Sequence, residues 1–250
     1  AVGYVALFVN TTGYGNTAIG KSSLDANTTA AYNTAVGEAS LTDNTTGDNN
    51  TAVGRAALSS NTTGALNTAV GKNAGDTTTT GGGCVILGAL ADSSAAGGNY
   101  VNAIGYNVSG EAGYTTLGES GSDIRAQHGV ATWATVSDER VKKDIEDSTV
   151  GLNFINDLRP VTFNYRNKGD LPKEFRAYEE DSTEVYKSEK SQHGFIAQEV
   201  KAAIDKHSDI KDGFSMWDDD ETGQQRVGET ALIPILTKAV QELSAKVEVL

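Results

Sequence analysis

A short charged run, SDERVKKD at residues 137–144, carries residue types that could form a nucleophile and its base. A serine hydroxyl is a weak nucleophile until a base takes its proton, and a lysine amine can be that base once desolvation or nearby cations lower its pKa. Ser137 offers the hydroxyl, and Lys142 has Arg140 and Lys143 beside it in the sequence. Taken alone, the same run is also typical of a solvated turn or a helix N-cap.

The run stands where the composition of the chain changes sharply. Residues 1–136 hold 4 Lys or Arg and 9 Asp or Glu, whereas residues 137–250 hold 16 and 24. The two parts carry net charges of −5 and −8, which add to −13, so a polyanionic partner such as nucleic acid would be repelled. We find no apolar run near the roughly 18 residues of a membrane span and no N-terminal targeting signal, and we expect no membrane insertion.

The first part repeats with a period of 17 residues. NTAIG at 16–20 returns as NTAVG at 33–37, 50–54 and 67–71, and leucines at 24, 41 and 58 share the step. Each in-phase glycine follows an aliphatic residue, beginning with Val2 and ending with Ile104. These glycines are Gly3, Gly20, Gly37, Gly54, Gly71, Gly88 and Gly105. Such self-similarity indicates one unit stacked on itself, with each copy burying its apolar face against its neighbours.

The composition of the repeat predicts strands and turns. Two glycines per repeat, with Thr, Asn and Val between them, disfavour helix. We therefore predict a mainly β fibre, a β-solenoid or interleaved β-prism, with aliphatic columns inside and Asn and Thr facing water or forming ladders. A disordered linker would not keep aliphatic residues in register. Because Ala1–Gly3 is already in phase, we expect the segment to end a longer fibre.

Two further features of the repeat region are a break in its period and a single cysteine. The glycine of YTTLG (114–118) falls 13 rather than 17 residues after Gly105, so we expect the register to fail there and a transition segment to end near Trp133. Cys84, the single cysteine, forms no disulfide within the chain and is interpreted as a small buried hydrophobe rather than a reactive thiol.

The second part predicts an α+β module. A helix capped by Ser148 stops before Pro160, a strand follows at 161–165, and HGFIAQEVKAAI at 193–204 indicates a strand running into a helix. Residues 167–191 are interpreted as a solvated excursion and 208–228 as a polar loop.

The C-terminal helix carries a heptad seam, which favours a coiled coil between chains, although packing on its own domain is the alternative. The seam residues are Ile233, Leu236, Val240, Leu243, Val247 and Leu250.

These patterns resemble known families. Residues 1–118 are similar to head repeats of trimeric autotransporter adhesins and to shafts of phage tail fibres, which implies a homotrimer. SDERVKKDI, GLNFINDLRPVTFNYR, HGFIAQEV and ALIPILTKAVQEL occur in the order seen in the C-terminal intramolecular chaperone auto-processing domain of endosialidase-type tailspikes, other tail fibres and some bacterial surface proteins. The expected divisions are a repeat stalk at 1–118, a transition segment at 119–136 and the chaperone domain at 137–250.

The resemblance implies a trimeric chaperone that folds the attached fibre and then cuts itself off before the serine of a Ser-Asp-x-Arg-x-Lys motif. The cut would fall between Val136 and Ser137, in one turnover and without cofactor or metal. Lys142 would be the base and His193 a proton carrier or orienting group. The supporting positions are Asp138 and Arg140 of the motif, with Gln198 and Glu199 as polar partners.

Two other functions stay open at this stage. The C-terminal module could align three chains in a trimer without cutting itself off. Alternatively, the Thr and Asn ladders could form a face that binds a receptor, a glycan or ice. Placement on a virion tail fibre or on a bacterial surface is equally undecided by the sequence.

The spacing between Ser137 and Lys142 raises a geometric question. Five residues put two side chains on opposite faces of a strand, roughly 17 Å apart, or about 140° apart around a helix. Either the chain bends sharply between them, or the lysine comes from a neighbouring chain. We favour the second arrangement, because it makes cutting conditional on assembly.

Overall fold

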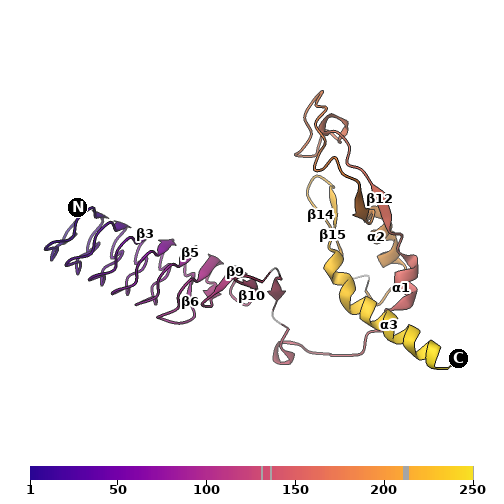
Figure 1. Ribbon diagram of the computed structural model, residues 1–250, viewed down its shortest axis with the longest axis horizontal. Helices are drawn as coiled ribbons and strands as arrows, with labels where there is room; N and C mark the ends of the chain where they lie inside the picture. Colours follow the sequence, from indigo (N-terminus) through magenta and orange to yellow (C-terminus); the bar gives the residue numbers. More distant parts are fainter. Residues whose placement is uncertain (131, 136, 211–213, 250) are drawn as a thin grey trace. The chain divides into compact units, whose positions relative to one another are not determined.

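The computed structural model describes residues 1–130, 132–135, 137–210 and 214–249. The chain forms two compact units, Ala1–Lys143 and Asp144–Leu250. Figure 1 shows a stack of similar coils in the first unit and helices with short strand pairs in the second.

The first unit is a β-solenoid with one short strand per 17-residue turn, as predicted. Each strand pairs in parallel with the next and in exact repeat phase, so that Ala18 faces Ala35 and Ala35 faces Ala52. The strands are β1 (Thr17–Ile19), β2 (Thr34–Val36), β3 (Thr51–Val53), β4 (Thr68–Val70), β5 (Val85–Leu87) and β7 (Asn102–Tyr106).

The in-phase glycines are required by close backbone approach. At Gly20 the φ angle is +135°, and a Cβ added there would lie 2.4 Å from the carbonyl oxygen of Gly37. No side chain fits between coils at that distance, and an L-residue would also be strained at this φ. The glycine column predicted from the sequence is therefore a consequence of how tightly the turns stack.

The core of the solenoid is built from alanine and leucine, and this corrects one expectation. The central strand residues, such as Ala18, Ala35 and Ala52, are buried, as are Leu24 and Leu41. The aliphatic residues that precede the glycines point outward instead of inward, because residues on either side of the buried alanine occupy the opposite face of the strand. The coil is narrow, so alanine rather than valine fills its centre.

Buried asparagines form ladders inside the coils. The Asn44 amide donates to Asn27 Oδ1 at 3.2 Å and to the Gly47 carbonyl at 3.0 Å, while Asn61 Nδ2 donates to Asn44 Oδ1 at 2.9 Å. A second ladder lets each asparagine oxygen accept from the backbone N–H one turn on, as Asn50 Oδ1 does from Asn67 at 3.0 Å. The predicted ladders are thus confirmed, but they lie inside the protein rather than in water.

Cys84 is buried, as predicted, and continues the second asparagine ladder. Its N–H donates to Asn67 Oδ1 at 3.0 Å, and its thiol lies 3.3 Å from the Gly98 carbonyl, the contact an asparagine amide makes in earlier turns. Burial raises the pKa of the Cys84 thiol, which favours its neutral, unreactive form.

The stacking continues past the point where the period shortens, so the expected failure of register at Tyr114–Gly118 is wrong. Strand β9 (Tyr114–Glu119) pairs in parallel with β7 and places Leu117 beside Ile104 and Gly118 beside Gly105. Only the return loop is shorter. Antiparallel strands β10 (Ser122–Gln127) and β11 (Ala134–Thr135) then end the sheet, and a side pair joins β6 (Asp92–Ser93) to β8 (Ser109–Gly110).

The second unit is a small α+β region with its own core. Its elements are α1 (Leu152–Asp157), β12 (Val161–Phe163), η2 (Lys168–Asp170), β13 (Gln192–Gly194), α2 (Ala197–Asp205), β14 (Trp217–Asp219), β15 (Gln225–Val227), η3 (Glu229–Ala231) and α3 (Leu232–Glu248). Phe154, Val200, Met216 and Ile235 are buried together at its centre. The strand-to-helix prediction at 193–204 is confirmed.

Two local expectations in this unit are wrong. Ser148 does not cap α1; its hydroxyl bonds to Val150, and Gly151 holds the N-cap position. The N–H of Leu152, at the first turn of α1, donates instead to Glu242 Oε2 of α3 at 2.9 Å. The cap is therefore supplied by a helix that is far away in the sequence. The loop predicted at 208–228 contains the β14–β15 hairpin.

Helix α3 uses two faces. Leu232, Ile235 and Ala239 are buried against the unit's own core. The heptad seam lies on another face and is exposed, from 44% at Leu236 to 68% at Val247; its last predicted member, Leu250, lies outside the described residues. Within the described part of the chain, no helix combines the length and apolarity needed to cross a membrane.

Candidate functional site

Ser137 and Lys142 meet within one chain. The segment from Ser137 to Lys142 contains one 3₁₀ turn, η1 (Glu139–Val141), and the N–H of Lys142 donates to the Glu139 carbonyl at 3.0 Å. This turn brings Lys142 Nζ to 2.7 Å from Ser137 Oγ. A 3₁₀ turn is tighter than either regular conformation considered from the spacing. The structure therefore has the sharply bent chain, and a lysine from a neighbouring chain is not needed for this contact.

Asp138 and Arg140 hold that turn. Asp138 is the N-cap, and its Oδ1 accepts from the Arg140 backbone N–H at 2.9 Å and from Nε at 2.8 Å, while Oδ2 accepts from a terminal guanidinium nitrogen at 2.6 Å. The hydrogen bonds from Arg140 lower the pKa of the Asp138 carboxyl to about 2, and the carboxylate raises the pKa of Arg140. The capped-turn interpretation of the run is thus correct, and the cap fixes the segment that joins Ser137 to Lys142.

The Ser137 and Lys142 side chains are both exposed. In the structure Lys142 Nζ donates this hydrogen bond to Ser137 Oγ. A deprotonated lysine amine could accept the hydroxyl proton along the same line, and the distance is within the range for such transfer. The peptide carbonyl that Ser137 would attack belongs to Val136, which lies outside the described residues.

His193, Gln198 and Glu199 belong to the second unit, whereas Ser137, Asp138, Arg140 and Lys142 belong to the first. His193 lies on β13 opposite Thr162 of β12, and its Nδ1 is 3.2 Å from Thr162 Oγ1. The ring is exposed. Sequence reasoning missed Thr162, although the strand pattern of VTFNY placed an outward threonine there.

Glu199 pairs with Arg159, which the sequence analysis did not identify. Arg159 Nε donates to Glu199 Oε2 at 2.9 Å, and a second nitrogen contacts Oε1. The guanidinium lowers the pKa of Glu199 and holds it ionised. Glu199 thereby ties α2 to the segment before β12.

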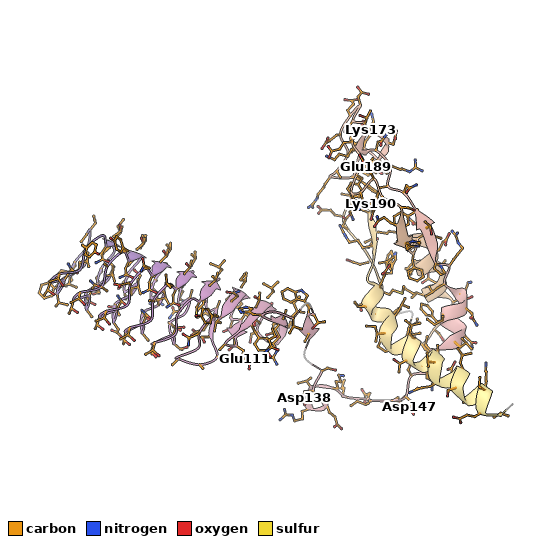
Figure 2. The ribbon with its side chains drawn as sticks, in the orientation of Figure 1. Glu111, Asp138, Asp147, Lys173, Glu189 and Lys190 are labelled. Atoms are coloured by element: carbon orange, nitrogen blue, oxygen red, sulfur yellow. The ribbon has the colours of Figure 1, made fainter. Side chains whose placement is uncertain are left out.

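A cleft of about 660 Å³ opens beside His193 and Gln198. Aromatic side chains make one part of its wall, and Lys187 Nζ lies 5.5 Å from the Tyr165 ring centre and 5.2 Å from that of Tyr186. Figure 2 shows side chains of the neighbouring excursion, where Lys173, Glu189 and Lys190 are labelled. Among the described residues, no group of three or more His, Cys, Asp or Glu could hold a metal ion.

Comparisons with known proteins give one finding. No curated protein and no solved structure matches the chain. Residues 137–209, which begin at Ser137 and follow a β-solenoid of stacked 17-residue repeats, match the family described as chaperone of endosialidase.

Proposed function

We propose that this chain is the C-terminal part of a trimeric fibre, in which the segment from Ser137 onward acts as an intramolecular chaperone and releases itself by cutting between Val136 and Ser137. The observation that carries the proposal is the 2.7 Å contact between Lys142 Nζ and Ser137 Oγ. It is supported by the family match, which starts at the same serine. This family match also favours a phage tail fibre as the setting.

The cut follows from the chemistry of the pair. Ser137 Oγ bonds to the carbonyl carbon of Val136 while Lys142 accepts the hydroxyl proton. The peptide C–N bond then breaks, and its nitrogen takes up a proton, leaving an ester between Val136 and the Ser137 side chain. Water attacks that ester, which gives a Val136 carboxylate and restores the Ser137 hydroxyl.

Asp138 and Arg140 act as positioning residues in this proposal, because they cap the turn that joins nucleophile and base. His193 is assigned as a proton carrier or orienting group. Gln198 and Glu199, which lie on α2, are assigned as polar residues that support His193.

Association of three chains is supported by the exposed heptad seam of α3. Leu236, Leu243 and Val247 project from a helix whose other face is already buried in its own unit. A seam with a 3, 4 spacing is completed by equivalent helices from other chains.

Mass spectrometry of purified, denatured protein tests the cut. We expect fragments that end at Val136 and begin at Ser137, none of them from Ser137→Ala, and none from Lys142→Arg, because arginine keeps the charge but cannot serve as the base. Equal cutting in Ser137→Ala, or cutting elsewhere, would remove Ser137 from the proposal.

Two further variants separate positioning from chemistry. Asp138→Asn keeps an oxygen that can accept the Arg140 N–H, whereas Asp138→Ala loses both the cap and the ion pair. We expect slower cutting in Asp138→Asn and slower still in Asp138→Ala. His193→Gln, which retains hydrogen bonding, is expected to cut faster than His193→Ala.

A second function is favoured by the capped turn itself: a module that registers the trimer and never cuts. The two hydrogen bonds from the Arg140 guanidinium to the Asp138 carboxylate give these two motif residues a structural role that needs no catalysis. An intact chain after long incubation, together with a trimer by light scattering, would select this alternative.

A further inference from the structure

The solenoid carries apolar side chains on its outer surface that do not pack into its core. A row of aliphatic side chains runs along the outside of the stack, one from each coil, and each residue pairs in register with the next. This aliphatic file consists of Val2, Ile19, Val36, Val53, Val70, Leu87, Ile104 and Leu117. At about 4.8 Å between strands, it is about 34 Å long.

The file lies outside the core of the chain. Val53 is 37% exposed, Val70 41% and Ile19 45%, whereas the residue between each outward pair, an alanine in most coils, is buried. The interior is already complete, because the alanine and leucine columns pack together there. Repeated large aliphatic side chains at solvent-facing positions indicate a surface that is covered by a partner.

The charge pattern favours another copy of this chain as that partner. The chain carries a net charge of −13, so copies repel one another over most of their surface. The outward positions of strands β1 to β5 and β7 carry no charge: threonine accompanies the aliphatic residue in β1 to β4, and valine and asparagine do so in β5 and β7. Strand β9 has a threonine beside Leu117 but ends in the exposed carboxylate Glu119. Copies can therefore meet along β1 to β5 and β7 without bringing carboxylates of these strands together.

The spacing favours the same partner. An identical chain offers the same strand period, so its file can interdigitate with this one along the whole length. The exposed seam of α3 independently calls for parallel copies of the same helix.

We propose that the aliphatic file is the line along which copies of this chain meet, in parallel and in register. The inference rests on the proposed function only for the association of chains, and it predicts that the stalk stays associated after the C-terminal segment has been released.

Disulfide trapping tests the contact. Val53→Cys is introduced into a Ser137→Ala chain, so that cutting plays no part, and Thr63→Cys is the matched control because it is also exposed but lies in a turn outside the strand. Native Cys84 is buried, and the chain without added cysteine controls for it. Because a disulfide needs Cα atoms within about 7 Å, we expect at least about tenfold more covalent dimer from Val53→Cys than from Thr63→Cys.

The outcomes separate this inference from the proposed function. If light scattering reports associated chains but Val53→Cys forms no more dimer than Thr63→Cys, the file is not the contact, and the proposed cut and helix association stand. A monomer by scattering would overturn both the file and the trimer.

A mixing experiment tests direction. Ile19 and Ile104 are five strand steps apart, about 24 Å. Chains with Ile19→Cys and chains with Ile104→Cys, distinguishable by mass and mixed before folding, should each cross-link with their own kind. Abundant mixed dimers would mean an antiparallel or shifted contact and would overturn the parallel register.

Discussion

The two units satisfy their polar groups in opposite ways. In the solenoid, uncharged amides are buried and bonded to the same residue type 17 positions away, as Asn44 is to Asn27 and Asn61. In the C-terminal unit, charged pairs such as Arg159–Glu199 lie near the surface. A buried amide is costly to leave unpaired, whereas water can replace a partner in an exposed ion pair. In the stalk, the loss of a buried hydrogen bond is therefore costly, whereas an exposed ion pair of the C-terminal unit can be lost at little cost.

The largest expected effect comes from interrupting a ladder. Asn44→Ala leaves Asn27 Oδ1 and the Gly47 carbonyl without their buried donor, and we expect the free energy of unfolding of the stalk to fall by about 3 kcal/mol. Arg159→Ala is the control in the other unit, where the exposed pair should cost less than about 1 kcal/mol. Urea unfolding of each variant measures both, and similar losses would break the comparison.

A second prediction concerns a departure from the repeat. Gly75 occupies the phase of Leu24, Leu41 and Leu58, and Ile86 occupies the phase of the core alanines. A Cβ added at Gly75 would lie 3.0 Å from Leu58 Cδ2 and 3.1 Å from Ile86 Cδ1. The isoleucine thus fills the volume that a leucine takes in other coils.

We expect Gly75→Leu alone to destabilise the stalk by about 2 kcal/mol through overpacking, and Ile86→Ala alone to cost a similar amount through a cavity. The double variant restores the repeat and should recover most of the loss. Thermal unfolding of the single and double variants forms the test; additive losses would show that the two positions do not exchange volume.

These cases show what the sequence could predict. The period and the glycine column were readable because a stacked backbone leaves no room for Cβ. The side of the strand was not readable, since Thr-Ala-Val contains two residues that could lie inside, and only the narrow coil selects alanine. At the candidate site, a capped turn was readable from the residue types of the run, although which residue forms the cap was not. The contact between Ser137 and Lys142 was not, because it depends on one 3₁₀ turn rather than on a regular period.

A smaller effect is expected where the first ladder stops. Thr78 stands in the phase of Asn44 and Asn61, and both Thr78 Oγ1 and Asn61 Oδ1 are buried without a hydrogen-bond partner. Thr78→Asn would supply a donor to Asn61, and we expect a gain of about 1 kcal/mol in the stability of the stalk. Thr78→Val, which removes the hydroxyl but leaves Asn61 unpaired, is the control and should gain less. A loss in Thr78→Asn would show that the ladder cannot be extended there.

The smallest effect is a difference in the pH response of the two units. Burial raises the pKa of Asp92 in the stalk to about 6, with Asp76 nearby also opposing ionisation, whereas Arg159 lowers the pKa of Glu199 in the C-terminal unit. A carboxyl with a raised pKa stabilises the fold when protonated, so the contribution of Asp92 is present below about pH 4 and is lost as the pH rises through about 6. Glu199 acts with the opposite sign: its contribution to stability is present at neutral pH and is lost as the pH falls below the ordinary pKa range of a glutamate.

We therefore expect the thermal unfolding temperature of the stalk in the Ser137→Ala chain to rise as the pH is lowered from 7 to 5. The unfolding temperature of the C-terminal unit should change only in stronger acid, where it should fall. Calorimetry at a series of pH values measures both. Asp92→Asn is the control that should flatten the response of the stalk. Glu199→Gln should reduce the acid response of the C-terminal unit without removing it, because the pKa values of Asp157, Asp209 and Asp220 are lowered as well. If Asp92→Asn leaves the pH dependence of the stalk unchanged, the response belongs to other carboxylates.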